Sequence, residues 1–252
     1  MEQTVLLFGK GFNYSQDGPG NRLVYHLAGC NMHCPWCSNP EGMTREKAGR
    51  ALSVVPTDVM KKEILAARAL FYDGGGVTFT GGEATLQYDA LRDLLIFCRE
   101  NGIDTALETN ATHCKLPALF PLLSHLMMDC KHWDKNVLRE VTGADTQAIF
   151  ANLEAVAAAG LPALIRIPLI HSFNDREEDP AGFAALFSAL RAKVPAGVEG
   201  FSAELLPYHE YGRGKWDKLG LPYAVRDGYV TASYCRALTA ALQNVGISIR
   251  NT

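Results

Sequence analysis

Short apolar runs alternate with longer amphipathic stretches from about residue 22 to the end of the chain. The short runs are rich in β-branched and other apolar residues, which is typical of buried strands. They are Arg22 to Leu27, Val77 to Thr80, Asp104 to Glu108, Leu126 to Asp129, Ala163 to Ile167, Glu199 to Leu206 and a last, shorter run at Ile247 to Ile249. Strands joined by helices form parallel sheets, either open and doubly wound or curled into a barrel. Roughly six βα units are too few to close a barrel, so we expect an α/β fold with a partial (β/α)6 barrel.

The stretches between these runs carry apolar residues at helical spacing. Two sets of four fall at positions i, i+3, i+4 and i+7, so each set shares one face of a helix. They are Leu91, Leu94, Leu95 and Cys98, and Phe183, Leu186, Phe187 and Leu190. A third helix is predicted over Thr146 to Ala159, because Gly160 and Pro162 form a stop signal after it. Each helix should bury its apolar face against the sheet.

The length and composition of the chain limit its class. At roughly 150 residues per domain, a chain of 252 residues without a Pro-, Gly- or Ser-rich linker predicts a single domain over residues 1–252. Hydrophobic residues make up 48% and charged residues 20%, which excludes the disordered and coiled-coil classes. With 24 Lys and Arg against 27 Asp and Glu, the chain lacks the basic surplus that general nucleic-acid binding needs.

The compartment is indicated by the cysteines and by the apolar runs. Seven cysteines are an odd number in a chain long enough to have a good core, which favours a reducing compartment over disulfides. The first residues begin with an acid and lack a small-residue cleavage pattern, so no signal peptide is predicted. No apolar stretch approaches the roughly 20 residues that cross a bilayer. We therefore expect a cytoplasmic protein with no membrane partner.

Three cysteines follow the first predicted strand as a CxxxCxxC motif, Cys30, Cys34 and Cys37. Soft thiolates at this spacing favour iron or zinc over disulfide pairing. A structural zinc ion needs a fourth protein ligand, for which His33 is the candidate. A cubane iron–sulfur cluster explains the three thiolates without it and leaves one iron free to bind a ligand. A zinc-binding interaction module remains the alternative.

A second motif ends the next predicted strand, where Thr80 is followed by Gly81, Gly82 and Glu83. Glycines allow the backbone to approach a ligand closely. A strand-end carbonyl or the Glu83 carboxylate could accept a hydrogen bond from a ligand ammonium group. The alternative is an ordinary turn, which the preceding cysteine motif disfavours.

Together the two motifs resemble those of the radical S-adenosylmethionine (SAM) enzymes. Further segments resemble the glycyl radical enzyme activating enzymes of the pyruvate formate-lyase activator type over nearly the whole chain. They are DGPGNR at 17–22, GGGVT at 74–78, LETN at 107–110, MMDCK at 127–131 and ELLPYHEYG at 204–212. The resemblance implies a partial barrel of the radical SAM type. Ser38 to Gly82 contains no cysteine, so the ferredoxin-like insert that many such activators carry is missing and one cluster is expected.

The resemblance implies a set of cofactor-binding residues. Cys30, Cys34 and Cys37 would hold one 4Fe-4S cluster, whose fourth iron binds the amino and carboxylate groups of SAM. Trp36 would lie beside the adenine, and Arg166 would pair with the cofactor carboxylate. The other implied contacts are Ser38, Gly81, Gly82, Glu83, Asp129, Cys130, Lys131 and His209. Alternatively, Asp129 and Lys131 form a surface ion pair of little energy, and His209 is a hydrogen-bonded loop histidine.

Two further sites are implied. Asp17, in the DGPG turn, would lie near the bound glycyl loop of a protein substrate, although the turn alone also explains its glycines and proline. Glu108, Thr109, Met127 and Asp129 resemble a site for a monovalent cation. Glu108 stands where the family usually has an aspartate.

The function implied by the resemblance is activation of a glycyl radical enzyme under anaerobic conditions. Reductive cleavage of SAM would give a 5′-deoxyadenosyl radical, which would take a Cα hydrogen from one glycine of the partner. Reduced flavodoxin or ferredoxin would supply the electron, and a monomer is expected. The alternative within the same chemistry is a radical SAM enzyme that acts on a small molecule or a peptide.

Overall fold

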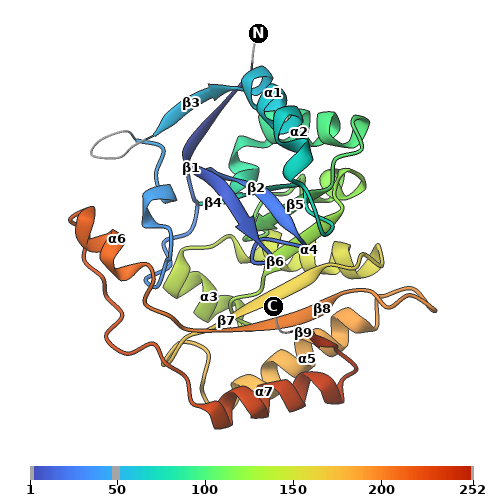
Figure 1. Cartoon of the computed structure of the whole chain (residues 1–252). Coiled ribbons are helices and arrows are strands. Elements are labelled where there is room, and N and C mark those ends of the chain that lie inside the picture. The colour runs from blue at the N-terminus through green and yellow to red at the C-terminus, as the bar shows by residue number, and fades with distance from the viewer. Residues whose placement is uncertain (1–2, 47–51, 251–252) are drawn as a thin grey trace.

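A sheet of nine strands runs through the centre of the fold in the computed structural model, which describes residues 3–46 and 52–250 (Figure 1). The strand order is β3-β1-β2-β4-β5-β6-β7-β8-β9. The strands are β1 (Thr4–Tyr14), β2 (Asn21–Leu27), β3 (Ser53–Pro56), β4 (Val77–Gly81), β5 (Thr105–Thr109), β6 (His125–Asp129), β7 (Leu164–Leu169), β8 (Ser202–Pro207) and β9 (Ile249–Arg250).

The pairs along the series β2-β4-β5-β6-β7-β8-β9 are all parallel, as the βα pattern predicts. At the other end, β1 lies antiparallel to both β2 and β3. Among the described residues β3 and β9 form the two edges and do not pair, so the sheet is an open, partial barrel. The predicted fold class is confirmed.

The helices surround the sheet (Figure 1). They are α1 (Thr57–Ala67), α2 (Tyr88–Glu100), α3 (Lys135–Thr142), α4 (Thr146–Ala158), α5 (Asp179–Arg191), α6 (Arg213–Lys218) and α7 (Ala232–Asn244), with short 3-10 turns at Pro40–Gly42, Arg68–Leu70, Ala84–Gln87 and Leu116–Leu122. The predicted apolar faces of α2 and α4 are buried, and so is that of α5 except for the half-buried Leu186. No described helix is long and apolar enough to cross a bilayer.

The core lies between the sheet and these helices. Leu91, Leu94 and Leu95 of α2 are completely buried, and each contributes roughly 1.5–3 kcal/mol through the burial of its side chain. Neighbouring helices pack side by side, α1 on α2 and α5 on both α4 and α7. Most of the buried apolar side chains belong to one cluster that includes residues of β1 and of α7.

A buried arginine joins the amino-terminal ends of three strands. Arg22 of β2 is completely buried, and its Nε donates a hydrogen bond of 2.7 Å to Thr78 Oγ1. Its Nη2 donates to the carbonyl of Val77 at 3.0 Å and lies 2.8 Å from Asp104 Oδ1. His125 Nε2 lies 3.2 Å from the other oxygen of Asp104. Because every guanidinium nitrogen has a partner, the cost of burying this charge is offset.

This arrangement predicts that the protein loses stability in acid. Burial alone would raise the pKa of Asp104, but His125 and Arg22 outweigh it and hold the pKa below its usual value. The folded state therefore binds this proton less tightly than the unfolded state. The stabilisation is present above about pH 4 and is lost as the pH falls through the lower folded pKa. Urea unfolding between about pH 3 and pH 7 should show a weaker acid dependence in D104N than in the wild type.

The exposed Asp217 of α6 provides the control. D217N should keep the acid dependence of the wild type. Equal slopes for D104N and the wild type would contradict the role of this ion pair.

Candidate active site

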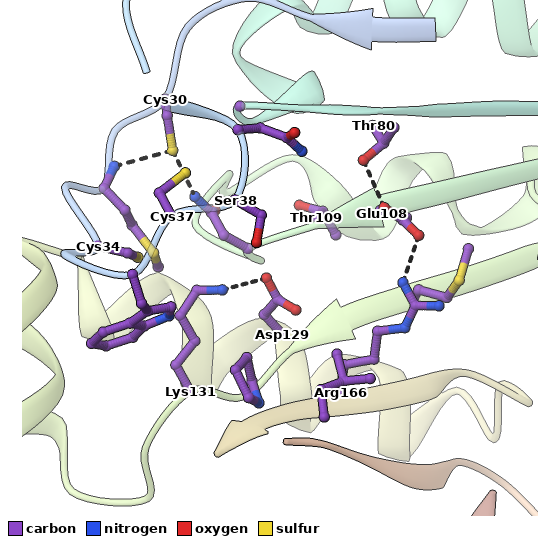
Figure 2. Close-up of a pocket in the computed structure, with 18 of the residues that line it drawn as sticks. Cys30, Cys34, Cys37, Ser38, Thr80, Glu108, Thr109, Asp129, Lys131 and Arg166 are labelled. Carbon is purple, nitrogen blue, oxygen red and sulfur yellow. Dashed lines mark hydrogen bonds and ion pairs between the residues drawn. The ribbon is translucent and has the colours of Figure 1, made fainter. Parts of the chain in front are cut away.

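A cavity opens at the carboxyl ends of the parallel strands, where their side chains face the loop after β2 (Figure 2). Fourteen of the seventeen residues predicted to bind a cofactor, cation or substrate line it. They are Cys30, Cys34, Trp36, Cys37, Ser38, Gly81, Gly82, Glu108, Thr109, Met127, Asp129, Lys131, Arg166 and His209. Asp17, Glu83 and Cys130 do not belong to the lining. Strand ends and the loops that follow them commonly form active sites in βα folds.

The three cysteines of the CxxxCxxC motif lie on one tightly held loop. The amide of Cys37 donates to the carbonyl of Cys34 at 3.1 Å, and Cys30 Sγ accepts from the amide of Met32 at 3.4 Å. The side-chain amide of Asn110, at the end of β5, also donates to Cys30 Sγ at 3.8 Å. All three thiols line the cavity, so a group held by them would be exposed to a ligand there.

The donor set fits an iron–sulfur cluster better than a single metal ion. His33, the candidate fourth ligand for zinc, is exposed and does not line the cavity. Within residues 3–46 and 52–250, no three His, Cys, Asp or Glu side chains are close enough to hold one ion. A cubane binds its thiolates through different irons, so they stand further apart than ligands of one ion do. Three soft donors around one cavity match that requirement.

The free thiols are protonated at neutral pH. Burial raises the pKa of Cys30 to about 11 and that of Cys34 to about 12. Burial also raises the pKa of Cys37. Lys131 acts in the opposite direction on all three, because its positive charge favours the thiolate. Loading of a metal group must therefore release protons, and Lys131 reduces that cost.

Asp129 and Lys131 form a partly buried ion pair at the end of β6. Lys131 Nζ lies 2.5 Å from Asp129 Oδ2, and the side chain of Lys131 is only 12% exposed. Burial alone would lower the pKa of Lys131, but Asp129 and the neighbouring Cys34 outweigh it and raise it. A fixed ammonium group therefore lies between a carboxylate and the cysteine loop. The alternative of an exposed surface pair of little energy does not match this position.

The backbone of Gly81 and Gly82 forms part of the wall. Gly81 has φ +129°, a conformation that favours glycine, and the amide of Gly82 donates to the carbonyl of Leu27 at 2.9 Å. A Cβ atom on Gly82 would collide with the carbonyl oxygens of Gly29 and Gly42. The end of β4 therefore packs directly against the loop after β2, and Gly81 and Gly82 line the cavity with their backbone because they have no side chains of their own.

Glu83 differs from the expectation, because its carboxylate turns away from the cavity. Its Oε1 accepts hydrogen bonds from the amide of Thr85 at 3.0 Å and from Thr109 Oγ1 at 2.8 Å. Its Oε2 accepts from the amide of Asn110 at 2.6 Å. The hydroxyl of Thr85 also donates to Oε1, so four donors satisfy the buried charge, two of them from β5 and the residue after it. Glu83 thus joins the ends of β4 and β5, and the backbone of Gly81 and Gly82 is what faces the cavity.

Arg166 of β7 stands at the centre of an ion-pair network on the opposite wall. Its Nη1 lies 2.5 Å from Glu108 Oε1 and its Nε 2.8 Å from Glu204 Oε2. Its Nη2 donates to the carbonyl of Gln16 at 3.0 Å. Glu108 Oε2 accepts from Thr80 Oγ1 at 2.6 Å, which extends the network to β4 (Figure 2). Nη1 and Nη2 each have a second N–H that these bonds do not use, and a cofactor carboxylate could accept from them. The pairing of Arg166 with that carboxylate stays a prediction.

The remaining predicted residues lie in different surroundings. Trp36 is nearly buried and packs on Phe173, with ring centroids 4.5 Å apart. His209 lies beside Tyr211, and burial lowers its pKa, so it is neutral at physiological pH. Cys130 is buried outside the cavity.

Asp17 belongs to the turn between β1 and β2. Its carbonyl accepts from Thr78 Oγ1 at 2.7 Å, and its carboxylate accepts from the side-chain amide of Asn13. Gly18 and Gly20 both have positive φ, as a tight turn requires. The carbonyl of Gln16 binds Arg166, so this turn lies next to the network of the opposite wall.

Sequence reasoning missed several residues of the site. Glu204, a lone acid in the apolar strand β8, is 2% exposed and pairs with Arg166. Asn110, which contacts the cysteine loop, is visible in the sequence as the last residue of LETN. Trp216 of α6 donates from Nε1 to the carbonyl of Cys37 at 2.8 Å and covers the loop from outside. The helix α6 has only six residues, too few to show a helical period of apolar residues, so this contact could not be predicted from the sequence.

Comparisons with known proteins agree with this geometry. Residues 24–184 match the Radical SAM superfamily. The chain is 35% identical over 217 residues to the pyruvate formate-lyase-activating enzyme of Streptococcus mutans, a match that spans 83% of this chain and 79% of that protein. It is 30% identical to the isethionate sulfite-lyase activating enzyme of Nitratidesulfovibrio vulgaris, over 90% of this chain and 91% of that protein. The crystal structure of a domain of a pyruvate-formate lyase-activating enzyme from Bacteroides vulgatus superimposes with a TM-score of 0.56 at 26% identity, covering 70% of this chain and 98% of that one.

Proposed function

The chain belongs to the radical SAM superfamily, and we propose that it activates a glycyl radical enzyme. Membership of the superfamily implies a 4Fe-4S cluster and SAM as cofactors, and the enzyme is a radical SAM oxidoreductase of the activase type. The observation that carries the proposal is the similarity to activating enzymes along more than four fifths of the chain. Two of these relatives are named for different partners, so the family alone does not select the partner.

When bound, the cluster and SAM would supply a 5′-deoxyadenosyl radical for removal of one hydrogen atom from the Cα of the target glycine. One electron per turnover comes from reduced flavodoxin or ferredoxin. The side chains of Cys30, Cys34 and Cys37 would hold the cluster at the edge of the cavity. The fixed ammonium of Lys131 would balance the negative charge that three thiolates bring to this buried position.

Other residues would bind and orient SAM. The bare backbone of Gly81 and Gly82 allows the cofactor ammonium to approach the strand-end carbonyls. Trp36 offers an aromatic ring for the adenine, and the neutral His209 offers a hydrogen bond. Asp17 and its turn stand beside Arg166, where the glycyl loop of a partner would enter.

The experiment that tests the proposal uses anaerobically reconstituted enzyme, dithionite and SAM. Pyruvate formate-lyase and isethionate sulfite-lyase, the partners named by the two relatives, are added in separate samples. We expect 5′-deoxyadenosine together with a glycyl doublet in the electron paramagnetic resonance spectrum of one partner. Formation of 5′-deoxyadenosine without a doublet on any glycyl radical enzyme encoded near this protein would favour a small-molecule or peptide substrate instead.

A further inference from the structure

The wall formed by β5, β7 and β8 already contains a positive charge. The guanidinium of Arg166 bridges Glu108 and Glu204 at 2.5 Å and 2.8 Å and also reaches the carbonyl of Gln16. Burial alone would lower the pKa of Arg166, but the two glutamates outweigh it and raise it. The group is therefore permanently cationic. The resemblance implies a monovalent cation beside this group, at Glu108 and Thr109 of β5 and at Met127 and Asp129 of the neighbouring β6.

Three of the four residues implied as cation ligands already use side-chain oxygens in ion pairs or hydrogen bonds. Glu108 uses one carboxylate oxygen for Arg166 and the other for Thr80 Oγ1, at 2.6 Å. Asp129 Oδ2 is paired with Lys131 at 2.5 Å. Thr109 Oγ1 donates to Glu83 at 2.8 Å and accepts from the amide of Ala111 at 3.0 Å. A hard cation needs several oxygen ligands, and an ion here would compete with these partners for the oxygens of Glu108, Asp129 and Thr109.

A cation at Glu108 would also meet repulsion. It would have to bind the carboxylate within a few ångströms of a guanidinium that already lies 2.5 Å from the same group. Two like charges at that separation disfavour each other strongly in a partly buried site. The ion would therefore have to displace Arg166, which would leave Glu204 without its 2.8 Å ion pair.

We propose that the guanidinium of Arg166 takes the place of a bound monovalent cation in this protein, and that SAM binding is independent of sodium and potassium. The inference rests on the SAM-binding part of the proposed function and needs no glycyl radical partner. The length of the Glu108 side chain explains the arrangement. An aspartate at this position would be shorter by one carbon–carbon bond, about 1.5 Å, and would no longer reach Arg166 at hydrogen-bond distance.

The test measures the affinity of the anaerobic holoenzyme for SAM in four salts at equal ionic strength. The cations are lithium, sodium, potassium and tetramethylammonium, and the readout is isothermal titration calorimetry. We expect dissociation constants that agree within about twofold. A parallel ²³Na resonance experiment should show no line broadening by the protein beyond that caused by an equal concentration of bovine albumin.

A SAM affinity of the wild type that falls about tenfold or more in tetramethylammonium would overturn the proposal. So would specific broadening of the sodium resonance. The wild-type protein alone decides both points, so the test does not depend on any variant folding. Because no partner is present, failure here is distinct from failure to form a glycyl radical.

The variant E108D tests the reason for the arrangement. Its shorter carboxylate should release Arg166, free oxygens for an ion and make SAM binding depend on sodium or potassium by about tenfold. The matched control is E63D, which shortens a carboxylate that pairs with Lys10 at 2.5 Å away from the cavity. E63D should remain as cation-independent as the wild type. If E108D bound SAM as tightly as the wild type and independently of the cation, the Glu108–Arg166 contact would not be the reason that SAM binding needs no cation.

Discussion

Replacement of Cys34 by alanine is expected to abolish both the iron–sulfur cluster and the cleavage of SAM. Cys34 lines the cavity and is the middle cysteine of the CxxxCxxC motif. Without it, a cubane would keep only two of its three protein ligands. After anaerobic reconstitution, C34A should contain almost no acid-labile sulfide and form no 5′-deoxyadenosine. The fold should persist, because the change removes one sulfur atom from a loop and costs about 1 kcal/mol.

The control is C114A, since Cys114 is an exposed free cysteine outside the cavity. It should retain the absorption of the cluster and the cleavage rate of the wild type. Circular dichroism of both apo-proteins separates loss of the cluster from loss of the fold. Full iron, sulfide and activity in C34A would disprove the assignment of the cluster to this loop.

The parallel part of the fold could be predicted from sequence because most of its strands are short, largely buried apolar runs; β9, Ile249–Arg250, is the exception. The predicted run at Val77 to Thr80 differs from β4 by one residue, and the run at Asp104 to Glu108 is shifted by one residue from β5. The antiparallel strands β1 and β3 were missed for two physical reasons. Residues 10–12 of β1 are exposed and include two exposed side chains, Lys10 and Phe12, so the strand lacks a regular alternation. β3 has only four residues and ends at Pro56, and its partner lies about fifty residues earlier in the chain.

The sequence predicted which residues form the site better than it predicted the directions of their side chains. Motifs locate residues at strand ends, and strand ends of one sheet converge on the same edge, so most of the chosen residues line one cavity. The direction of a side chain depends on partners that are distant in sequence. Glu83 turns away because Thr109 and Asn110 offer donors, and Arg166 is fixed by Glu108 and Glu204. No local pattern contains that information.

The position of Glu83 leads to a large expected effect of its own. E83Q should lower the free energy of unfolding by about 3 kcal/mol, because charge-assisted hydrogen bonds of a buried group are lost. Glu83 is 1% exposed, and donors face both of its oxygens. Glutamine has an NH₂ group in place of one oxygen, so in either orientation a buried donor is left without an acceptor. Urea unfolding of the apo-protein measures this loss without involving either cofactor.

The same substitution should also weaken SAM binding in the reconstituted enzyme, since Glu83 holds the end of β4 against β5. The backbone amide of Asn110 donates to Glu83 at 2.6 Å, and its side-chain amide donates to Cys30 Sγ. The matched control is E154Q on the exposed face of α4, where the pair with Lys193 is open to solvent. It should change stability by about 0.5 kcal/mol or less. If E83Q unfolded at the same urea concentration as the wild type, the Glu83 carboxylate would not be what fixes the ends of β4 and β5. The role expected from the sequence, in which Glu83 accepts a hydrogen bond from a ligand ammonium group, would then regain support.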